Sequence, residues 1–242
     1  MILAAAQFRS KAGDVASNID RHLQFADEAN RHGADIIVFP ELSLSGYEPT
    51  LAEGLETTAD DTRFEPLKRQ AQALTMTICA GMPLMTSGKP EIGMIVWQPD
   101  GRAETYGKQI LHDDELPFFS SAKRNLTISI KGQCLFPAIC YESLQTSHAE
   151  AASKGGANVY LASVAKPEGG MRKAVAHYPT MAKQHKMTVI VANAVGPSDN
   201  FVSVGQSAVW NSTGECLGSC NETDEALLIA DIPNGCVEIV DL

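Results

Sequence analysis

The sequence predicts a layered α/β protein with mixed sheets. Apolar segments of strand length alternate with helical patterns in both halves of the chain. Each half also contains two strand-like segments joined by a tight turn, at residues 99–101 and at residues 211–214, which is typical of an antiparallel hairpin. Alternating strands and helices together with hairpins favour mixed sheets covered by helices. Periodicity alone leaves open whether one doubly wound sheet or two packed sheets form.

The first half predicts a β-α-β unit followed by a helix and a hairpin. A helix from residue 17 or 18 to His32 has a plausible N-cap, helical spacing of apolar residues and a stop at Gly33. It lies between two strands, and a polar, acidic loop at 51–61 follows. The strands and helix expected around these segments are 2–6, 36–39, 64–74, 76–80, and 92–97 paired with 102–106.

The second half repeats the strand and helix alternation. A helix at 147–154 ends at Gly155 and Gly156, residues 166–170 form a loop, and a second helix covers 171–186. The strands expected here are 135–139, 158–162, 189–192, a hairpin of 206–210 with 215–218, and 226–231. Because no linker or low-complexity segment divides the chain, we expect a single domain over residues 1–242.

Composition excludes several classes of partner. The formal net charge of −10, from 29 acidic and 19 basic residues, disfavours nucleic acid and anionic membrane surfaces. No apolar run approaches the roughly 18 to 20 residues of a membrane span, and the first ten residues lack a basic region before their short apolar run.

The six cysteines contain no CxxC pair, so we expect a reducing, cytoplasmic location. Cys216, Cys220 and Cys236 leave a metal site open, although no histidine follows His185.

Three chemically active residues stand where predicted strands end. Cys140 follows the apolar strand 135–139, Glu41 follows the strand 36–39, and Lys108 follows the second arm of the first hairpin. A strand end fixes the position of a nucleophile, and the turn after it leaves the N–H groups of Tyr141 and Glu142 free to face a developing oxyanion. Each residue also has an ordinary interpretation: a small buried hydrophobe for Cys140, a helix cap for Glu41 and a surface lysine for Lys108.

Three motifs carry a family resemblance. FPELSLSGY, YGKQILHDDE and AICYES resemble the signature blocks of the nitrilase superfamily of carbon–nitrogen hydrolases, amidase-like branch, in the family's order and over nearly the whole chain. The resemblance implies a four-layer α-β-β-α sandwich of two mixed sheets. It also implies that Glu41, Lys108 and Cys140 are catalytic and that a second glutamate, Glu115, assists them. Asp113 and Asp114 remain alternatives for this fourth residue, as does a solvated acidic loop.

These residue types suit amide hydrolysis. A thiol with a reference pKa of about 8.5 needs a base, and burial raises the pKa of a carboxylate such as Glu41 towards neutrality. Protonated Lys108 and the Tyr141 N–H would hold the oxyanion. We therefore predict a thiol amidohydrolase that cleaves a small linear amide or N-carbamoyl compound through a Cys140 thioester and releases ammonia or an amine. We expect no metal or cofactor, and a homodimer or higher homo-oligomer.

Other functions and mechanisms remain open. A Cys/His mechanism would place His112, His148 or His177 beside Cys140. A glutaminase that supplies ammonia to a partner synthetase, or a catalytically silent binding subunit, are alternatives to the amidase. The chain has no GxxxxGK[ST] motif for ATP, so a synthetase would have to be a separate partner.

Substrate contacts are expected from residues near these motifs. We assign Tyr47 and Tyr141 to the substrate because each belongs to a signature block. The basic loop SVAKPEGGMRK predicts that Lys166, Arg172 or Lys173 reaches the far end of a bound amide. We expect ω-amides of short dicarboxylates or N-carbamoyl acids to be preferred over cationic amides and nitriles. Departures from the family pattern at Glu142, Gln145 and Gln184 concern the substrate and quaternary contacts more than the chemistry.

Overall fold

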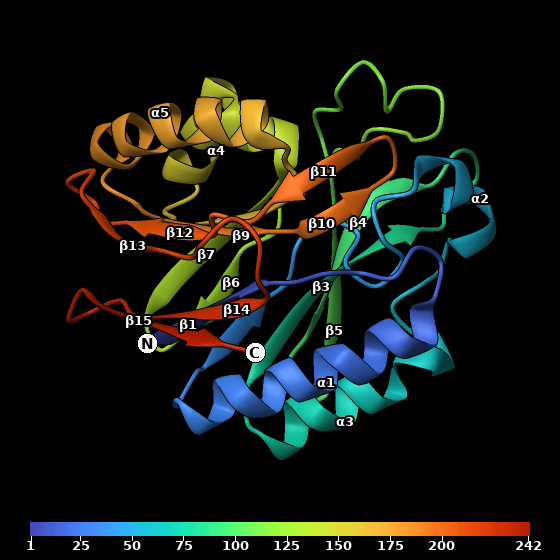
Figure 1. Ribbon diagram of the computed structural model, residues 1–242, viewed down its shortest axis with the longest axis horizontal. Helices are drawn as coiled ribbons and strands as arrows, with labels where there is room; N and C mark the ends of the chain where they lie inside the picture. The colour runs from blue at the N-terminus through green and yellow to red at the C-terminus, as the bar shows by residue number, and fades with distance from the viewer.

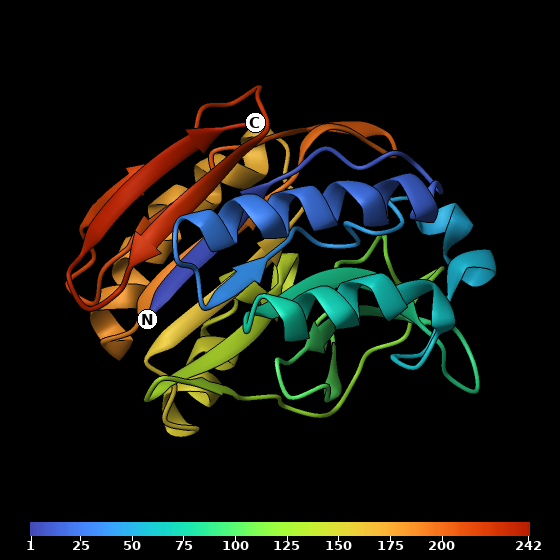
Figure 2. The ribbon, with the colours of Figure 1, turned by 90° about the horizontal axis from the view of Figure 1, so that it is seen from below.

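A computed structural model describes residues 1–242 and contains a four-layer α-β-β-α sandwich (Figure 1). Helices α1 (Val15–Arg31) and α3 (Glu65–Ala73) cover the outer face of one sheet, and Figure 2 shows them side by side. Helices α4 (Thr146–Lys154) and α5 (Glu168–His185) cover the outer face of the other. This is the two-sheet arrangement that the resemblance implied.

The first sheet has seven strands, with the three parallel strands β1, β2 and β3 in its middle. The β1-α1-β2 unit and the β4-β5 hairpin are present as predicted from the sequence. The strands, in spatial order, are β15 (Cys236–Asp241), β14 (Ala226–Asp231), β1 (Ile2–Gln7), β2 (Ile36–Val38), β3 (Thr77–Leu84), β4 (Glu91–Trp97) and β5 (Ala103–Gly107).

The second sheet has six strands, of which β7, β8 and β9 are parallel. Its spatial order is β13 (Cys216–Ser219), β12 (Ala208–Trp210), β9 (Thr188–Asn193), β8 (Val159–Val164), β7 (Gln133–Ile139) and β6 (Ile128–Ile130). Strands β10 (Val195–Ser198) and β11 (Phe201–Val204) form a separate hairpin. The short helices are Pro49–Leu51, α2 (Ala52–Leu55), Thr62–Phe64 and Cys140–Leu144.

Alternating side chains explain why the two sheets pack together. In β1, Leu3 and Ala5 enter the core between the sheets, whereas Ala4 and Ala6 enter the core beneath α1 and α3. The second sheet contributes Leu135 and Leu161 to the same inter-sheet core. Both faces of the central strands are therefore buried, which accounts for their continuous apolar sequences.

One hydrogen bond joins the two sheets at the ends of their parallel strands. The Oγ of Ser163, near the end of β8, donates to the carbonyl oxygen of Phe39, just after β2, at 2.8 Å. Chain segments that follow β2, β7 and β8 therefore lie at one edge of the sandwich. That edge receives Glu41 and Cys140, the residues expected to be catalytic.

Several element boundaries differ from the sequence prediction. Helix α5 begins at Glu168 rather than at 171, because Pro167 takes the extended N-cap conformation and Glu168 occupies the first turn. Strand β3 continues beyond residue 80 to Leu84, since it pairs with β4 over its whole length. Strands β6 and β15 and the β10-β11 hairpin were not predicted.

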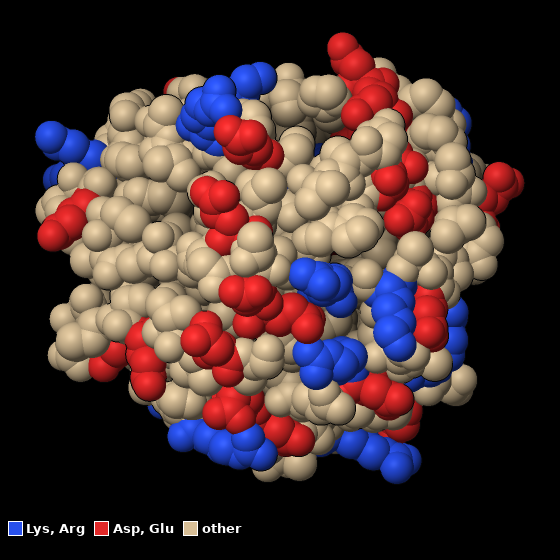
Figure 3. All heavy atoms as spheres, viewed as in Figure 1, with Lys and Arg blue, Asp and Glu red and all other residues tan.

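Surface features agree with the acidic composition. Figure 3 shows Lys and Arg side chains in small groups interspersed with Asp and Glu on the face viewed. None of the helices combines the length and the apolar character that a membrane span requires.

Candidate active site

Glu41 lies in a tight turn after β2 and is only 2% exposed. Its neighbour Leu42 has a φ of +52°, a left-handed conformation that is uncommon for a branched residue. The turn lies directly against β3, where a Cβ on Gly81 would come within 2.2 Å of the Leu42 nitrogen. Ser43 Oγ also accepts a hydrogen bond from the Gly81 N–H at 3.2 Å. Close backbone packing therefore fixes Glu41.

Lys108 connects two carboxylates at the end of β5. Its fully buried ammonium donates to Glu41 Oε1 at 2.8 Å and to Glu115 Oε1 at 2.6 Å. Glu115 also accepts from the Tyr47 hydroxyl at 3.0 Å and from the His112 N–H at 2.8 Å. A lysine ammonium has three N–H groups, so one remains for a ligand.

The structure distinguishes the three acidic residues of the HDDEL segment. Glu115 is 2% exposed and belongs to the buried cluster. Asp113 and Asp114 are exposed, and Asp114 pairs with His112 at 2.7 Å. Glu115 is thus the member of this segment that contacts Lys108.

Cys140 is the first residue of a short 3-10 helix that begins where β7 ends. Its φ of +49° gives the strand-to-helix turn a left-handed residue, a conformation that costs about 1 to 3 kcal/mol and is found at functional sites. The Cys140 carbonyl oxygen accepts a 2.5 Å hydrogen bond from Ser143 Oγ, which pairs with the Tyr178 hydroxyl at 2.7 Å. The cysteine remains partly exposed. As the next residues of the helix, Tyr141 and Glu142 carry N–H groups that lack an intrahelical acceptor.

Glu142 holds the Cys140 and Lys108 segments together. Its fully buried carboxylate accepts hydrogen bonds from the N–H groups of Ile139 and Gln109, each at 2.7 Å. One of these residues immediately precedes Cys140 and the other immediately follows Lys108. The Tyr106 hydroxyl donates to the same carboxylate at 2.7 Å. The role of the Glu142 side chain was not predicted from the sequence, where an acidic residue beside an apolar strand was the available signal.

Burial raises the pKa of Glu41 to about 7, although the charge of Lys108 opposes this shift and that of Glu115 adds to it. The direction and the cause of this shift are those expected from the sequence. Glu41 Oε2 is buried and has no hydrogen-bond partner. One oxygen of the carboxylate is thus held by Lys108, and the other can accept a proton near neutral pH.

The site favours the neutral thiol of Cys140 and the charged ammonium of Lys108. Burial, followed by the negative charge of Glu41, raises the pKa of the Cys140 thiol to about 11, while Lys166 and Lys108 counteract part of this shift. Burial alone would lower the pKa of Lys108, but Glu41, Cys140 and Glu115 raise it above its usual value. At neutral pH the thiol is therefore protonated and needs a base, whereas Lys108 keeps its charge.

Three of the four predicted substrate-binding residues lie at this site. Lys166 is 4% exposed, and its ammonium is 3.4 Å from the Cys140 carbonyl oxygen. The ring of Tyr141 is partly exposed and lies 5.0 Å from the ring of His112. Tyr47 is fixed by Glu115, as described above.

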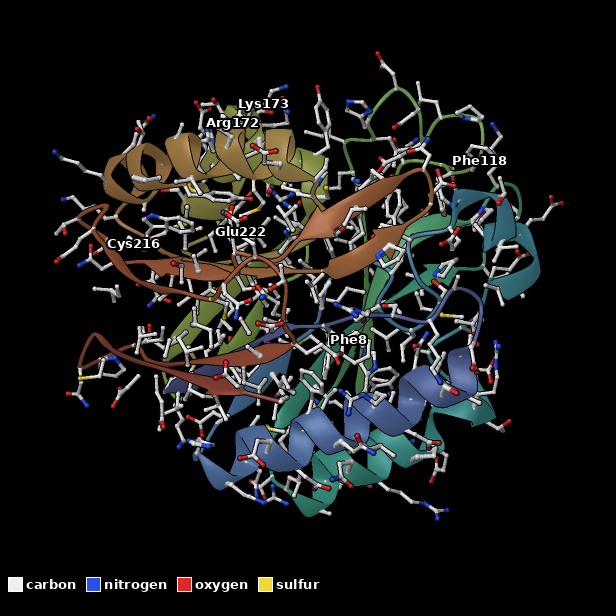
Figure 4. The ribbon with its side chains drawn as sticks, in the orientation of Figure 1. Phe8, Phe118, Arg172, Lys173, Cys216 and Glu222 are labelled. Atoms are coloured by element: carbon white, nitrogen blue, oxygen red, sulfur yellow. The ribbon has the colours of Figure 1, made fainter.

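The structure does not bring Arg172 into the site. Its guanidinium pairs with Glu168 at 2.7 Å, and both side chains are about three-quarters exposed, at 75% and 76%. Figure 4 places Arg172 and Lys173 on the outer side of α5. Both residues lie within the helix, as predicted, but on the face opposite buried Met171 and Ala174. The assignment of Arg172 to substrate binding is therefore corrected.

None of the three candidate histidines forms a hydrogen bond with Cys140, and the ring Nε2 of His177 is buried without any partner. Both ring nitrogens of His148 are occupied, by the Tyr160 hydroxyl at 2.6 Å and the Tyr106 hydroxyl at 2.8 Å. His112 is exposed and pairs with Asp114. The Cys140 sulfur forms its one hydrogen bond with the Ala165 carbonyl oxygen, at 3.7 Å, rather than with a histidine.

The β10-β11 hairpin borders the site and was missed in the sequence. The Phe201 ring lies 5.5 Å from the Tyr47 ring, and the Val204 N–H donates to the Lys166 carbonyl oxygen at 3.1 Å. Figure 1 shows the hairpin between α5 and the loop that follows β5. The signal in the sequence was the polar turn Ser198-Asp199-Asn200 between two short runs that contain valine.

Comparison with known proteins identifies the family. A family model described as carbon-nitrogen hydrolase matches residues 2–239. The chain belongs to the carbon–nitrogen hydrolase family. Among curated relatives of this carbon–nitrogen hydrolase, the glutamine-dependent NAD(+) synthetase of Acinetobacter baylyi is 27% identical over 222 residues, covering 88% of this chain and 40% of the synthetase. The (R)-stereoselective amidase of a Pseudomonas species is 25% identical over 225 residues, covering 90% and 80%.

Solved structures show the same fold. The NitN amidase from Nesterenkonia sp. AN1 matches this carbon–nitrogen hydrolase with a TM-score of 0.88 at 24% identity, covering 97% of this chain and 93% of the amidase. A glutamine-dependent NAD+ synthetase from Acinetobacter baumannii matches with a TM-score of 0.84 at 22% identity, covering 100% and 47%. The chain thus spans about two fifths to one half of the length of the synthetases it matches. The predicted membership of a carbon–nitrogen hydrolase family is confirmed by the family model, and the solved structures confirm the fold.

Proposed function

We propose that this carbon–nitrogen hydrolase is a thiol amidohydrolase that cleaves a small linear amide or N-carbamoyl compound through a thioester on Cys140. The observation that carries the proposal is the carboxylate of Glu41. One of its oxygens is bound to Lys108 at 2.8 Å, and the other is buried without a partner. A base with a pKa of about 7 therefore lies close enough to Cys140 for its charge to raise the pKa of the thiol.

In the first half-reaction, Glu41 takes the thiol proton as Cys140 Sγ attacks the carbonyl carbon. The carbonyl oxygen becomes an anion, which the free N–H of Lys108 and the N–H of Tyr141 stabilise. Glu41 then passes its proton to the nitrogen as the carbon–nitrogen bond breaks. Ammonia or an amine leaves, and the acyl group remains on Cys140 as a thioester.

In the second half-reaction, Glu41 deprotonates a water molecule that attacks the thioester carbonyl. The same two donors stabilise the second oxyanion. The carbon–sulfur bond breaks, the thiolate recovers its proton from Glu41, and the carboxylic acid leaves. One carboxylate with a near-neutral pKa therefore serves both steps as base and acid.

Glu115 has a supporting role in this proposal. Its contact with Lys108 at 2.6 Å keeps the ammonium charged and directed while Glu41 changes protonation state. Tyr47, whose pKa is raised by burial and by the charges of Glu41 and Glu115, stays protonated and keeps Glu115 in place. We propose Tyr47 and Tyr141 as residues that also contact the substrate.

A second candidate function is a glutaminase that supplies ammonia to a partner synthetase. The similarity to glutamine-dependent NAD(+) synthetases over 88% of this chain favours it. The hydrolytic steps would be those described above, with the side-chain amide of glutamine as substrate. The two functions differ in substrate and in the need for a partner.

Ammonia release by the purified chain tests the proposal. The substrates are butyramide, an N-carbamoyl amino acid, butyronitrile and glutamine, and the enzymes are the wild type, Cys140→Ala and the control Cys216→Ser at an exposed position. We expect ammonia from the amide or the carbamoyl compound with the wild type and the control, and none with Cys140→Ala. Turnover of glutamine alone would favour the second candidate. Tight binding of a substrate without turnover would favour a silent binding subunit, and full activity of Cys140→Ala would overturn the mechanism.

A further inference from the structure

The ammonium of Lys166 is buried and lacks a counter-anion. The residue is 4% exposed, and no carboxylate lies within 4.0 Å of its nitrogen. Its one hydrogen bond is a long contact of 3.4 Å with the Cys140 carbonyl oxygen. Lys108, by comparison, has two carboxylate partners. A buried cation is costly unless it is paired and hydrogen-bonded. An anionic group of a ligand would therefore stabilise the Lys166 ammonium.

The main chain of Lys166 is held on both sides. Its N–H donates to Asn193 Oδ1 at 2.9 Å, and its carbonyl oxygen accepts from the Val204 N–H at 3.1 Å. Asn193 is fully buried at the end of β9 and is itself held by the Gly205 carbonyl oxygen at 2.6 Å. These hydrogen bonds fix the backbone of Lys166, from which the side chain extends towards Cys140.

The position of Lys166 relative to the nucleophile limits what it can bind. The Ala165 carbonyl oxygen is 3.7 Å from the Cys140 sulfur, so the peptide that leads into Lys166 borders the thiol. Of the two lysines at the site, Lys166 lowers the pKa of this thiol more than Lys108 does. An anion that binds Lys166 must therefore lie within a few bonds of the carbon that the sulfur attacks.

We infer that Lys166 binds the carboxylate of an anionic substrate next to the scissile amide. The inference rests on the proposed amidohydrolase function and narrows its substrates to short amides or N-carbamoyl compounds that carry a carboxylate. Lysine recognises such a group as a compact charge with three donors. Exposed Arg172 has no part in this recognition. A neutral amide of similar length would leave the ammonium unpaired.

The experiment compares a substrate pair with and without the carboxylate. Succinamate and butyramide share the amide and the carbon chain, and only succinamate is charged. The wild type, Lys166→Met and the control Lys173→Met, at an exposed position of α5, are assayed for kcat/KM on both. Losing the partner of a charge-paired carboxylate costs about 30-fold to 5,000-fold in affinity. We expect Lys166→Met to lower the ratio of kcat/KM for succinamate to kcat/KM for butyramide by about that factor, because any effect of Lys166 on Cys140 is common to both substrates. Lys173→Met should leave this ratio unchanged.

Two results would overturn the inference. Equal losses on both substrates would mean that Lys166 acts on Cys140 rather than on the substrate. A wild type that prefers butyramide would mean that the site does not select anions. Both results leave the amidohydrolase function standing.

A binding measurement decides the inference if the wild type hydrolyses neither substrate, an outcome that would count against the proposed function instead. Calorimetry with Cys140→Ala and with the double variant Cys140→Ala/Lys166→Met measures succinamate binding without turnover. We expect heat of binding for succinamate with the single variant and none with the double variant. Equal binding by both variants would overturn the role of Lys166.

Discussion

Glu41 and Lys108 form a buried ion pair in which the carboxylate uses only one of its two oxygens. The Lys108 ammonium lies 2.8 Å from Oε1, and Oε2 is buried without a partner. A pair that existed only for stability would be expected to satisfy both oxygens, because an unsatisfied buried acceptor costs about 1 to 3 kcal/mol. The free oxygen is the position from which Glu41 can exchange a proton. The ion pair thus stabilises the base and leaves it reactive.

We predict that kcat/KM rises with pH through an apparent pKa near 7. The base must be ionised to act, so activity is low below the pKa of Glu41, which burial raises to about 7, and reaches a plateau above it. The thiol, with a pKa raised to about 11, stays protonated across this plateau. The measurement is a pH profile of kcat/KM from pH 5 to pH 9. An acid limb near pH 4.5, the value of an ordinary glutamate, would contradict the role of Glu41.

Glu41→Gln is expected to lower kcat by about 10²-fold to 10⁴-fold, the usual contribution of general acid and base catalysis. Its pH profile should lose the limb near 7. Glu53→Gln, on the exposed side of α2, is the matched control and should keep both the rate and the profile. A Glu41→Gln variant with an unchanged profile would assign the titrating group elsewhere.

We predict that the substrate acylates Cys140 and no other cysteine. Cys216 and Cys236 are exposed, but the sulfur of each hydrogen-bonds to a backbone carbonyl oxygen rather than to a carboxylate. An acid quench during turnover of a slow amide, followed by peptide mass mapping, should find the acyl group on Cys140 alone. Cys140→Ala should carry no acyl group and keep its circular dichroism spectrum. An acyl group on another cysteine in the wild type would contradict the assignment.

The strand ends made the central residues predictable from the sequence. An apolar run that ends in Glu41 or Cys140 marks both the strand and its terminus, so the position of each residue in the fold follows from periodicity. The left-handed conformations of Leu42 and Cys140 were not predictable, because they depend on close packing against β3 and on the start of the 3-10 helix. The sequence also could not show that Glu115, rather than Asp113 or Asp114, contacts Lys108. This contact depends on which carboxylate of the loop faces inward.

Strand β15 and the start of α5 differ from the prediction for two separate physical reasons. Strand β15 is largely exposed and lacks a regular alternation of buried and exposed residues, so its sequence does not signal an edge strand. The start of α5 was placed too late because Gly169 and Gly170 resemble a loop, although both lie within the helix. Lys166 stands before the helix and enters the site, whereas Arg172 lies on the outer face of the helix.

We predict that Glu142 positions the catalytic segments. In Glu142→Gln, one oxygen becomes an NH₂ group that cannot accept the N–H of Gln109 or Ile139, so a buried donor is left unpaired. We expect a loss of about 3 kcal/mol in the free energy of unfolding. We also expect kcat to fall at least about tenfold, because the Cys140 and Lys108 segments separate.

The control for this change is Glu150→Gln on α4, where the side chain is 46% exposed and pairs with Lys154 at 3.7 Å. A surface pair of this kind contributes about 0 to 1 kcal/mol, so stability and kcat should hardly change. Urea unfolding and steady-state kinetics measure both variants. If Glu142→Gln lost stability while the folded enzyme kept the wild-type kcat, the role of Glu142 would be limited to folding.

The last prediction concerns the packing that fixes Glu41. A methyl group on Gly81 would meet the Leu42 nitrogen at 2.2 Å and the Pro40 carbonyl oxygen at 2.9 Å, and both atoms are backbone. The turn that carries Glu41 must therefore move in Gly81→Ala. Overpacking of this kind costs about 1 to 3 kcal/mol, and a displacement of about 1 Å in a catalytic group lowers the rate about 10²-fold. Both effects are measured by thermal unfolding and by kcat/KM.

Gly88→Ala provides the matched control, because a Cβ at Gly88 meets no atom within 4 Å. It should leave stability and activity unchanged. The decisive comparison is between Gly81→Ala and Glu41→Gln, because both act on the same carboxylate, one by moving it and the other by neutralising it. A moved Glu41 keeps its ionisation, so Gly81→Ala should retain an acid limb in its pH profile while Glu41→Gln loses it. If Gly81→Ala were less stable but fully active, the position of Glu41 would not depend on its contact with β3.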